Sequence, residues 1–455
     1  MACSWASETA MGSSECSFPV PIPKSPIYPD SGGWCPDVPF ECTGSSHAVH
    51  GDGYVRAAMA SGSSASGYGS VAMAAGTATR EAPPGAASRR IGPEIAIDPE
   101  RLPSVSVLIP IYNVERYIAS ALDSLQAQTF GDFEAICIND GSRDSSRKIL
   151  QRYLDSDSRF RVIDKPNSGY GASINVGIAH ARGRYIAILE PDDFYEPDAL
   201  EKLMKVADST NADVVKGDYW FYWSKPAGRD SRPKEKRVCA HVISEEMTGH
   251  VFNAWTYPQI FFCNPSVWSA IYKRSFLRGN GLKMLETPGA SFQDLGFTFK
   301  VWALAQRVVC IGDPVLSYRQ DNEQSSVNDP GKAFCVCDEF DSMEDFVDAV
   351  PKRAALRPYL FRLRYDSYMW NFERLSSDLR ARFVKTMSGD FARCINRGDY
   401  VLSLFAYYQQ RNLQLVVEDP KRFLERFPEK PGRIGKAWYY FRIGGPKALL
   451  SAARK

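Results

Sequence analysis

Three carboxylates follow an apolar run in the segment ILEPDDFYEPDAL, residues 188–200. The run itself, residues 185–189, is partly β-branched, which is typical of a strand covered on both faces. Glu190, Asp192 and Asp193 come directly after it. Clustered carboxylates repel one another unless a cation lies between them, and Mg²⁺ or Mn²⁺ is usually held by one or two carboxylates together with substrate phosphates. The pattern therefore predicts a divalent metal that holds a diphosphate.

A helix is predicted directly after these acids. Pro197 and Asp198 are typical of a helix entry. Apolar residues then recur at helical spacing, at Leu200, Leu203, Met204 and Ala207. The acids therefore lie where a strand passes into a helix. In an open α/β sheet, ligands bind at that place, outside the carboxyl ends of the strands.

Polar or aromatic residues also end two other predicted strands. Pro110 and Tyr112 end one of them, and Asn139, Asp140 and Gly141 end the next. Each has an ordinary structural explanation, with Tyr112 as a half-buried aromatic residue and Asp140-Gly141 as a turn. Because all three strand ends meet at one edge of the sheet, we favour one shared ligand site over separate structural roles.

The elements that position these residues alternate between strand and helix patterns from residue 103 onward. Helical patterns separate five predicted strands, at residues 105–109, 133–138, 160–163, 185–189 and 214–215. This alternation predicts right-handed β-α-β units in an α/β fold with a mainly parallel sheet and flanking helices. A dinucleotide-binding or P-loop protein is disfavoured, because the first strand is not followed by G-x-G-x-x-G and the chain lacks G-x-x-x-x-G-K-[ST].

Composition divides the 455 residues into three parts. Residues 1–98 are rich in Gly, Ala, Ser and Pro and have no hydrophobic period, so we predict a disordered tail. Residues 99–330 carry the strand and helix patterns of the predicted α/β domain. In residues 331–455 the strand patterns cease and apolar residues keep helical spacing, which predicts a helical subdomain.

Charge and composition exclude several classes of protein. The formal net charge is +2, so no global field favours nucleic acid as a partner. No stretch reaches the ~20 apolar residues of a membrane span and the first residues lack a signal-peptide pattern, so we expect a cytoplasmic protein. The 11 cysteines are irregularly spaced, and the C-x-C of Cys335 and Cys337 has no second pair. We therefore predict reduced thiols rather than disulfides or a metal site there.

Two long segments resemble the nucleotide-binding half of a family 2 glycosyltransferase of GT-A fold, which is a Rossmann-like fold. They are VSVLIPIYNVERYIASALDSLQAQTFGDFEAICINDGSRDSSRKIL and KPNSGYGASINVGIAHARGRYIAILEPDD, and the resemblance runs from about residue 105 to residue 218. It implies a nucleoside diphosphate sugar as donor, most readily a UDP-sugar, with Mn²⁺ or Mg²⁺ as cofactor and inversion at the transferred sugar. It also implies a nucleotide-binding half at 99–220 and an acceptor half at 221–330.

A further resemblance concerns the later segments PGASFQDLGFTFKVWALAQRV and SYRQDNEQSSVN. These are similar to glycosyltransferases of bacterial capsule or surface polysaccharide assembly. The similarity implies an acceptor hydroxyl on a glycan or a lipid-linked glycan.

The family resemblance implies roles for single residues at the three strand ends. Pro110 and Tyr112 would line a nucleobase pocket, and Asp140 would contact the base. The residues placed near ribose and phosphate are Asn167, Gly169, Asn175 and Asp192. Glu190, Pro191 and Asp192 stand where the family carries its D-x-D metal motif. Glu190 replaces the first aspartate with a longer side chain, so Asp192 and Asp193 are the preferred metal ligands and Glu190 is the third candidate.

A transferase also needs a base for the acceptor hydroxyl, and the segment SFQDLGFTFKVWALA offers Asp294. In the family this base is commonly the aspartate of a Glu-Asp pair that opens a helix, and here the pair is Gln293-Asp294. The alternative role of Asp294 is an N-cap for that helix. Asn264, Trp268 and Gln293 are the candidate acceptor contacts, and Trp268 is equally a candidate core residue.

Two other classes of protein are alternatives to the transferase. A non-catalytic binding or scaffold protein of the same fold is favoured by Glu190 and Gln293, which both depart from the family pattern. It is disfavoured by the retention of Asp140, Asp192 and Asp294. A nucleotidyltransferase would carry a glycine-rich turn after the first strand, and IPIYNVERY contains no glycine.

The segment 433–455 combines basic and aromatic residues, in GKAWYYFRIGGPKALLSAARK and the Arg433 before it. One interpretation is peripheral contact with the anionic inner face of a membrane, which would suit a lipid-linked acceptor. The other is a helix that packs on the domain with solvated basic side chains. The sequence favours neither.

Overall fold

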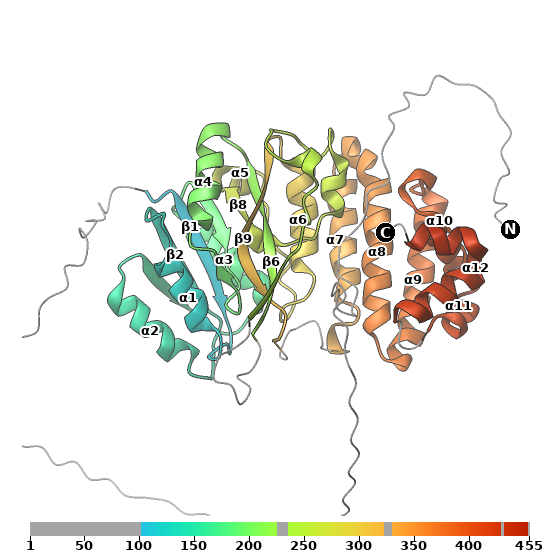
Figure 1. Cartoon of the computed structure of the whole chain (residues 1–455), viewed down its shortest axis with the longest axis horizontal. Coiled ribbons are helices and arrows are strands. Elements are labelled where there is room, and N and C mark those ends of the chain that lie inside the picture. The colour runs from blue at the N-terminus through green and yellow to red at the C-terminus, as the bar shows by residue number, and fades with distance from the viewer. Residues whose placement is uncertain (1–101, 225–234, 323–329, 429–431, 454–455) are drawn as a thin grey trace, which may run out of the picture. The chain divides into compact units, whose positions relative to one another are not determined.

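The computed structural model describes residues 102–224, 235–322, 330–428 and 432–453, so the predicted tail at 1–98 lies outside the described residues. The described part contains one sheet of nine strands, in the order β3-β2-β1-β4-β8-β6-β9-β5, with β7 paired to β6 (Figure 1). The strands are β1 (Val105–Ile111), β2 (Phe133–Asn139), β3 (Phe160–Asp164), β4 (Tyr185–Ile188), β5 (Phe194–Tyr195), β6 (Val214–Ser224), β7 (Glu235–Cys239), β8 (Ala270–Lys273) and β9 (Val308–Arg319). The predicted strands are confirmed as β1 to β4 and β6.

The first half of the sheet is parallel. β1 pairs in parallel with β2 and with β4, and β2 pairs in parallel with β3. β1, β2 and β4 are buried along their whole length, as their mainly apolar composition predicts. The helices between strands are α1 (Ile118–Gln126), α2 (Ser146–Ser156), α3 (Tyr170–His180) and α4 (Ala199–Thr210). α3 lies so close to the sheet that a Cβ on Gly177 would be 2.9 Å from a Leu108 methyl group.

The second half of the sheet is mixed. β8 is antiparallel to both β4 and β6, and it therefore separates two strands that the sequence pattern places as successive parallel strands. β9 then pairs in parallel with β6, while β5 and β7 are antiparallel edge partners. Six of the nine strands, β1 to β4 with β6 and β9, run in one direction, so the prediction of a mainly parallel α/β sheet is confirmed.

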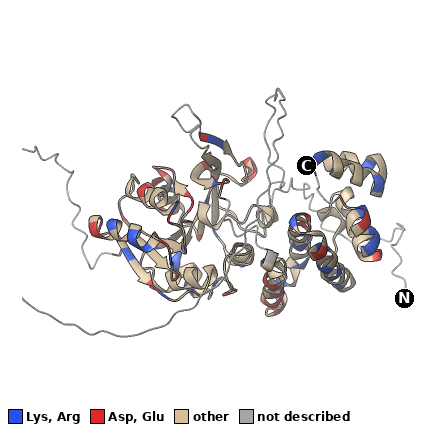
Figure 2. Cartoon of the chain, turned by 90° about the horizontal axis from the view of Figure 1, so that it is seen from below, with Lys and Arg blue, Asp and Glu red and all other residues tan. Residues whose placement is uncertain are grey.

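The helices α5 (Arg274–Gly279) and α6 (Gln293–Leu304) lie between β8 and β9. The last third of the chain is helical, as predicted, with α7 (Cys335–Asp348), α8 (Arg357–Arg374), α9 (Ser377–Arg397), α10 (Tyr407–Glu418), α11 (Pro420–Arg426) and α12 (Arg433–Ala453). α6 joins this helical part to the sheet, because Lys300 Nζ donates a hydrogen bond to Ser342 Oγ on α7 at 2.6 Å. Basic and acidic residues are interspersed over the described elements, in keeping with the small net charge (Figure 2).

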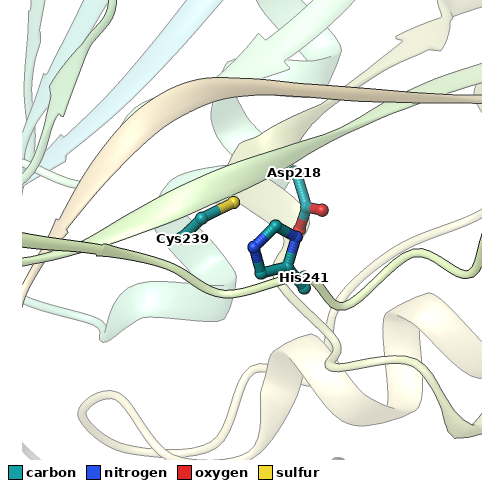
Figure 3. Close-up of side chains that lie close together, drawn as sticks. All are labelled: Asp218, Cys239 and His241. Carbon is teal, nitrogen blue, oxygen red and sulfur yellow. The ribbon is translucent and has the colours of Figure 1, made fainter. Parts of the chain in front are cut away.

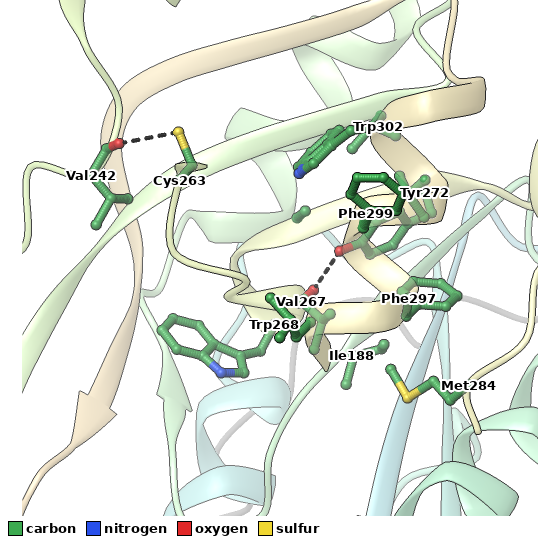
Figure 4. Packing of buried hydrophobic residues seen from close by; sticks show 14 of the residues in the cluster. Ile188, Val242, Cys263, Val267, Trp268, Tyr272, Met284, Phe297, Phe299 and Trp302 are labelled. Atoms are coloured by element: carbon green, nitrogen blue, oxygen red, sulfur yellow. Dashed lines mark hydrogen bonds between the residues drawn. The ribbon is translucent and has the colours of Figure 1, made fainter. Parts of the chain in front are cut away.

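A buried aromatic group fixes α6 against β8. The Tyr272 hydroxyl donates to the Val267 carbonyl at 3.1 Å, and the Tyr272 ring meets Phe297 edge-on at 5.7 Å between centroids (Figure 4). Phe299 and Trp302 are buried on the same helix. The first turn of α6, which carries Asp294, is therefore held at a defined place beside the sheet.

The cysteines of the described residues are all free thiols, as predicted. None of the described helices combines the length and the apolar composition that crossing a lipid bilayer requires.

Candidate active site

The acidic turn at residues 190–193 begins where β4 ends in the middle of the sheet. The Asp193 N–H donates to the Glu190 carbonyl at 3.1 Å, which closes a tight turn around Pro191. Glu190 Oε1 accepts a hydrogen bond from the Tyr170 hydroxyl at 2.5 Å. Burial, opposed by the hydrogen bond from Tyr170 and reinforced by the charges of Asp192 and Asp294, raises the pKa of Glu190 to about 8.

Asp294 is far from the acidic turn in the sequence and near it in the structure. It lies in the first turn of α6. The N-cap of this helix is Phe292, so the alternative prediction that Asp294 is the N-cap is wrong. Burial raises the pKa of Asp294 to about 6, with the Leu295 N–H, at 2.9 Å from Oδ1, lowering it in part. The Tyr170 hydroxyl donates to Glu190, while the Tyr170 N–H and Gln293 Nε2 both donate to the Gly289 carbonyl, so the first turn of α6 lies near the acidic turn. In keeping with this, the charge of Asp294 raises the pKa of Glu190 and of Tyr170.

Two residues at the end of β9 hold the acidic turn in place. Arg319 Nε donates to the Asp192 carbonyl at 2.9 Å, and the Arg319 N–H donates to Asp193 Oδ1 at 2.8 Å. Asn322 Nδ2 donates to Asp192 Oδ2 at 2.8 Å. Sequence reasoning did not single out Arg319 or Asn322, and the only signal was their place in the segment SYRQDNEQSSVN.

A pocket of about 580 Å³ lies next to this turn. Its lining is Tyr112, Asn113, Val114, Glu115, Arg116, Tyr117, Arg143, Asp144 and Asn322. Tyr112 is 45 % exposed there, whereas Pro110 is buried within β1. Asn322 links the pocket to Asp192, so a ligand with a base at Tyr112 and phosphates toward Asp192 would occupy adjoining space.

Asp140 lies at the end of β2, where its carboxylate is already bonded within the protein. Oδ1 and Oδ2 accept the N–H groups of Ser168 and Gly169, each at 2.9 Å, and Lys165 forms an ion pair with Oδ1. Asn167 Nδ2 donates to the Asp140 carbonyl at 3.2 Å. Asp140 and Asn167 thus shape the 165–169 loop, and their contacts with a nucleotide stay a prediction.

Asn175 and Gln293 hold the segment 284–291 from two sides. Asn175 exchanges two hydrogen bonds with the backbone of Met284, each at 2.9 Å. Gln293 Nε2 donates to Thr287 Oγ1 at 2.8 Å and to the Gly289 carbonyl at 3.2 Å. Both side chains therefore position this segment, and the nucleotide contact predicted for Asn175 and the acceptor contact predicted for Gln293 stay predictions.

The close approach of this segment to α3 gives a stability prediction. A Cβ on Gly171 would be 1.9 Å from the Leu285 carbonyl oxygen, so Gly171→Ala should lower the free energy of unfolding by ~1–3 kcal/mol. Gly389, within α9, has no atom within 4 Å of its Cβ position, and Gly389→Ala should raise that free energy by ~0.5–1 kcal/mol. Urea unfolding of both variants measures the contrast, and a Gly171→Ala protein as stable as wild type would contradict this packing.

Trp268 and Asn264 lie farther from the acids. Trp268 is 7 % exposed, and its ring stacks on Tyr318 at 4.8 Å between centroids and meets Tyr219 edge-on at 4.5 Å. Burial raises the pKa of Tyr318, and the charges of Asp193 and Asp192 raise it as well. Trp268 is thus a core residue behind Tyr318, as its alternative assignment predicted, while Asn264 is half-buried.

The acidic turn has the properties of a cation site. Asp193 is fully buried, its Oδ2 has no hydrogen-bond partner in the structure, and burial together with Asp192 raises its pKa well above the usual range. A divalent ion would remove this repulsion and favour the ionised carboxylates. In the described residues the turn does not supply three ligand atoms within 4.8 Å of one another. The fit is therefore to an ion held by one or two carboxylates together with a diphosphate.

A sheet of this order, with acids after its central strand and a nucleotide-sized pocket beside them, is the GT-A fold of nucleotide-sugar transferases. Residues 106–276 match the model of glycosyl transferase family 2, and this part of the chain is a family 2 glycosyltransferase domain.

Two curated relatives illustrate the similarity. The protein named "Putative glycosyltransferase EpsH" of Bacillus subtilis (strain 168) is 32% identical over 218 residues, which is 48% of this chain and 61% of EpsH. The chondroitin synthase of Escherichia coli is 41% identical over 102 residues, which is 22% of this chain and 15% of the synthase. The chain thus spans less than two thirds of the length of either relative.

Among solved structures, S. aureus TarS 1–349 in complex with UDP-GlcNAc aligns with 70% of this chain and 92% of its own. The sequence identity is 18% and the TM-score is 0.43.

Proposed function

We propose that this protein transfers a sugar from a nucleoside diphosphate sugar to a hydroxyl of a glycan or a lipid-linked glycan, with inversion, in the synthesis of a bacterial surface polysaccharide. One observation carries the proposal. Tyr170, whose hydroxyl donates to Glu190, donates its N–H to the Gly289 carbonyl, which also accepts Gln293 Nε2 from the residue before Asp294 on α6. A carboxylate base thus stands beside the place where a donor diphosphate would be held.

In this mechanism the donor base occupies the pocket at Tyr112, and the diphosphate extends toward Asp192. Arg116 and Arg143 line the same pocket and can balance phosphate charge. Asp192 and Asp193 would hold Mn²⁺ or Mg²⁺, with Glu190 as the third candidate. Such an ion supplies Lewis-acid neutralisation of the charge on a departing diphosphate.

Asp294 performs the proton transfer. Its carboxylate accepts the proton of the acceptor hydroxyl as that oxygen attacks the anomeric carbon of the sugar. The new C–O bond forms on the face opposite the diphosphate, whose bond to the same carbon breaks with the electron pair leaving on phosphate oxygen. A pKa of about 6 leaves Asp294 mostly ionised at neutral pH while keeping it more basic than an exposed aspartate.

Thermal unfolding with UDP, GDP, CDP and dTDP, each with and without Mn²⁺, tests the donor site. A ligand at one hundred times its dissociation constant adds ~2.7 kcal/mol to the free energy of unfolding, which shifts the midpoint by several degrees. We expect a Mn²⁺-dependent shift with one nucleotide, and UDP is the first to try. Equal midpoints with all four nucleotides would overturn the proposed donor site and favour a scaffold protein of this fold.

We also propose that α12 rests on an anionic membrane surface, where a lipid-linked acceptor would be found. Ile434, Trp438 and Phe441 are 87 %, 61 % and 40 % exposed, and their spacing places them on one face of the helix. The Trp438 and Phe441 rings stack at 5.8 Å between centroids. The exposed Arg442 follows on the same helical stretch, the exposed Lys447 lies beyond a kink of α12 at Gly444 and Gly445, and both suit anionic headgroups.

Co-sedimentation with anionic vesicles measures this contact. Replacing Trp438 and Phe441 by Ser removes two apolar side chains from the interface and should weaken binding by ~10-fold or more. Trp255→Ser is the control, because Trp255 is 46 % exposed but lies outside α12. Equal binding of the double variant and wild type, or equal binding to uncharged vesicles, would contradict the membrane role of α12.

A further inference from the structure

A mixed group of metal-ligating side chains lies away from the acidic turn, on the hairpin of β6 and β7. The pairing of these strands matches Trp220 with Cys239, and the same register continued by two residues places Asp218 opposite His241. Cys239 is the last residue of β7, and His241 follows it with a left-handed backbone (φ 48°). Figure 3 shows the thiol, the imidazole and the carboxylate turned toward one another.

The three ligand atoms all lie within 4.8 Å of one another, and among the described residues this is the one group of three or more His, Cys, Asp and Glu side chains that does so. A tetrahedral zinc site, with bonds of ~2.0–2.3 Å, requires ligand atoms about 3.3–3.8 Å apart. Small side-chain rotations would therefore close the group around an ion. The position of the group is fixed without metal, because the Val242 N–H donates to Asp218 Oδ1 at 2.9 Å.

The chemistry of the three ligands selects the class of metal. A thiolate and an imidazole favour a borderline-soft transition metal over Mg²⁺ or Ca²⁺, which prefer oxygen ligands. Asp218 is buried, Cys239 is half-buried and His241 is exposed, so the group opens to solvent on the His241 side. Three protein ligands with one open position is a usual arrangement for Zn²⁺.

The nearest lysine does not contact these three side chains and so does not neutralise their charge directly. Lys216 lies on the same strand as Asp218, but its Nζ bonds Ser266 O, Ser266 Oγ and Ser269 Oγ at 2.6–3.1 Å, which uses all three of its donors. A bound dication would displace the proton of the Cys239 thiol and stabilise the thiolate and the Asp218 carboxylate.

We propose that Asp218, Cys239 and His241 form a binding site for a transition-metal dication, with Zn²⁺ as the natural occupant. The site is separate from the proposed donor site, and neither depends on the other. The ion would clamp β7 to β6, the strand that pairs with β9 up to Arg319. The expected consequence is a more stable sheet edge rather than a part in the transfer chemistry.

Cobalt titration of the full-length metal-free protein tests the site, because thiolate ligation of Co²⁺ gives a charge-transfer absorption that carboxylate sites lack. We expect one equivalent of Co²⁺ to develop this band and one equivalent of Zn²⁺ to remove it. Cys239→Ser should abolish the band, and His241→Ala should weaken Co²⁺ binding by at least tenfold. Cys335→Ser, which alters a cysteine on α7 outside the group, should leave the band unchanged.

Three results would overturn the proposal. They are no charge-transfer band with folded wild-type protein, a band that persists in Cys239→Ser, and a band lost in Cys335→Ser. Zn²⁺ should also raise the midpoint of thermal unfolding in wild type and not in His241→Ala. His241 is exposed, so this variant should fold normally and keeps the test valid if Cys239→Ser proves unstable.

Discussion

Asp294→Asn should lower kcat for sugar transfer by ~10²- to 10⁴-fold, the usual value of a positioned general base. The substitution keeps the size of the side chain and its hydrogen bond from Leu295, so α6 should keep its first turn. The nucleotide dissociation constant should stay near that of wild type, because Asp294 faces the acceptor side of the reaction. Steady-state transfer and nucleotide binding, measured on the same preparation, separate the two effects.

The pH profile gives an independent readout of the same residue. The pKa of Asp294 is raised to about 6, so the carboxylate is protonated and inactive as a base below that pH. In wild type, kcat should therefore rise with pH through about 6 and level off above it. The Asn variant should lack this rise, since it has no group to titrate at that position.

Asp345→Asn, which alters an exposed acid on α7, is the matched control and should leave kcat unchanged. An Asp294→Asn protein that transfers sugar at the wild-type rate would show that another group takes the proton. Loss of nucleotide binding together with transfer would instead assign Asp294 a structural role at the start of α6.

Asp192→Ala should abolish the Mn²⁺-dependent part of nucleotide binding. Asp192 is the half-buried acid of the turn and takes a hydrogen bond from Asn322 at the edge of the pocket, whereas Asp193 is fully buried. Wild type at one hundred times the dissociation constant gains ~2.7 kcal/mol from the nucleotide and Mn²⁺ together. In the variant, nucleotide with Mn²⁺ should shift the midpoint no more than nucleotide alone.

Asp198→Ala is the control for this loss of charge. Asp198 lies a few residues later, and its side chain is 43% exposed beside Lys202. Its removal should leave the Mn²⁺-dependent shift intact. A full Mn²⁺-dependent shift in the Asp192 variant would show that Glu190 or Asp193 holds the metal instead. An equal loss of the shift in both variants would show that it depends on overall negative charge rather than on metal ligation by Asp192.

Much of the fold was predictable because its signals are local. The runs at 105–109, 133–138, 160–163 and 185–189 are continuous in the sequence and became β1 to β4 in parallel order. A chain that alternates such runs with amphipathic segments has few ways to bury both. The acidic turn follows from the same pattern, because the end of a central strand fixes where the next residues lie.

The partners of the site were not predictable from local pattern. β8, at residues 270–273, lies between β4 and β6 in the sheet. No local periodicity predicts pairing between segments that are so far apart in the sequence. Arg319 and Asn322 reach the acidic turn because β9 pairs with β5, the strand directly after the turn, as well as with β6. For the same reason the sequence could not tell that Asn175 and Gln293 would be occupied in holding the segment 284–291.

The sequence by itself determined the class of fold, the acids after β4 and the identity of Asp294 as the candidate base. Only the tertiary structure decided which groups meet. It brought Asp294 beside Glu190, bonded Asp140 to its own loop, and set Cys239 and His241 against Asp218. The physical reason is that local propensity acts over a few residues, whereas burial and strand pairing join residues far apart in the chain, and a site is made by those long-range contacts.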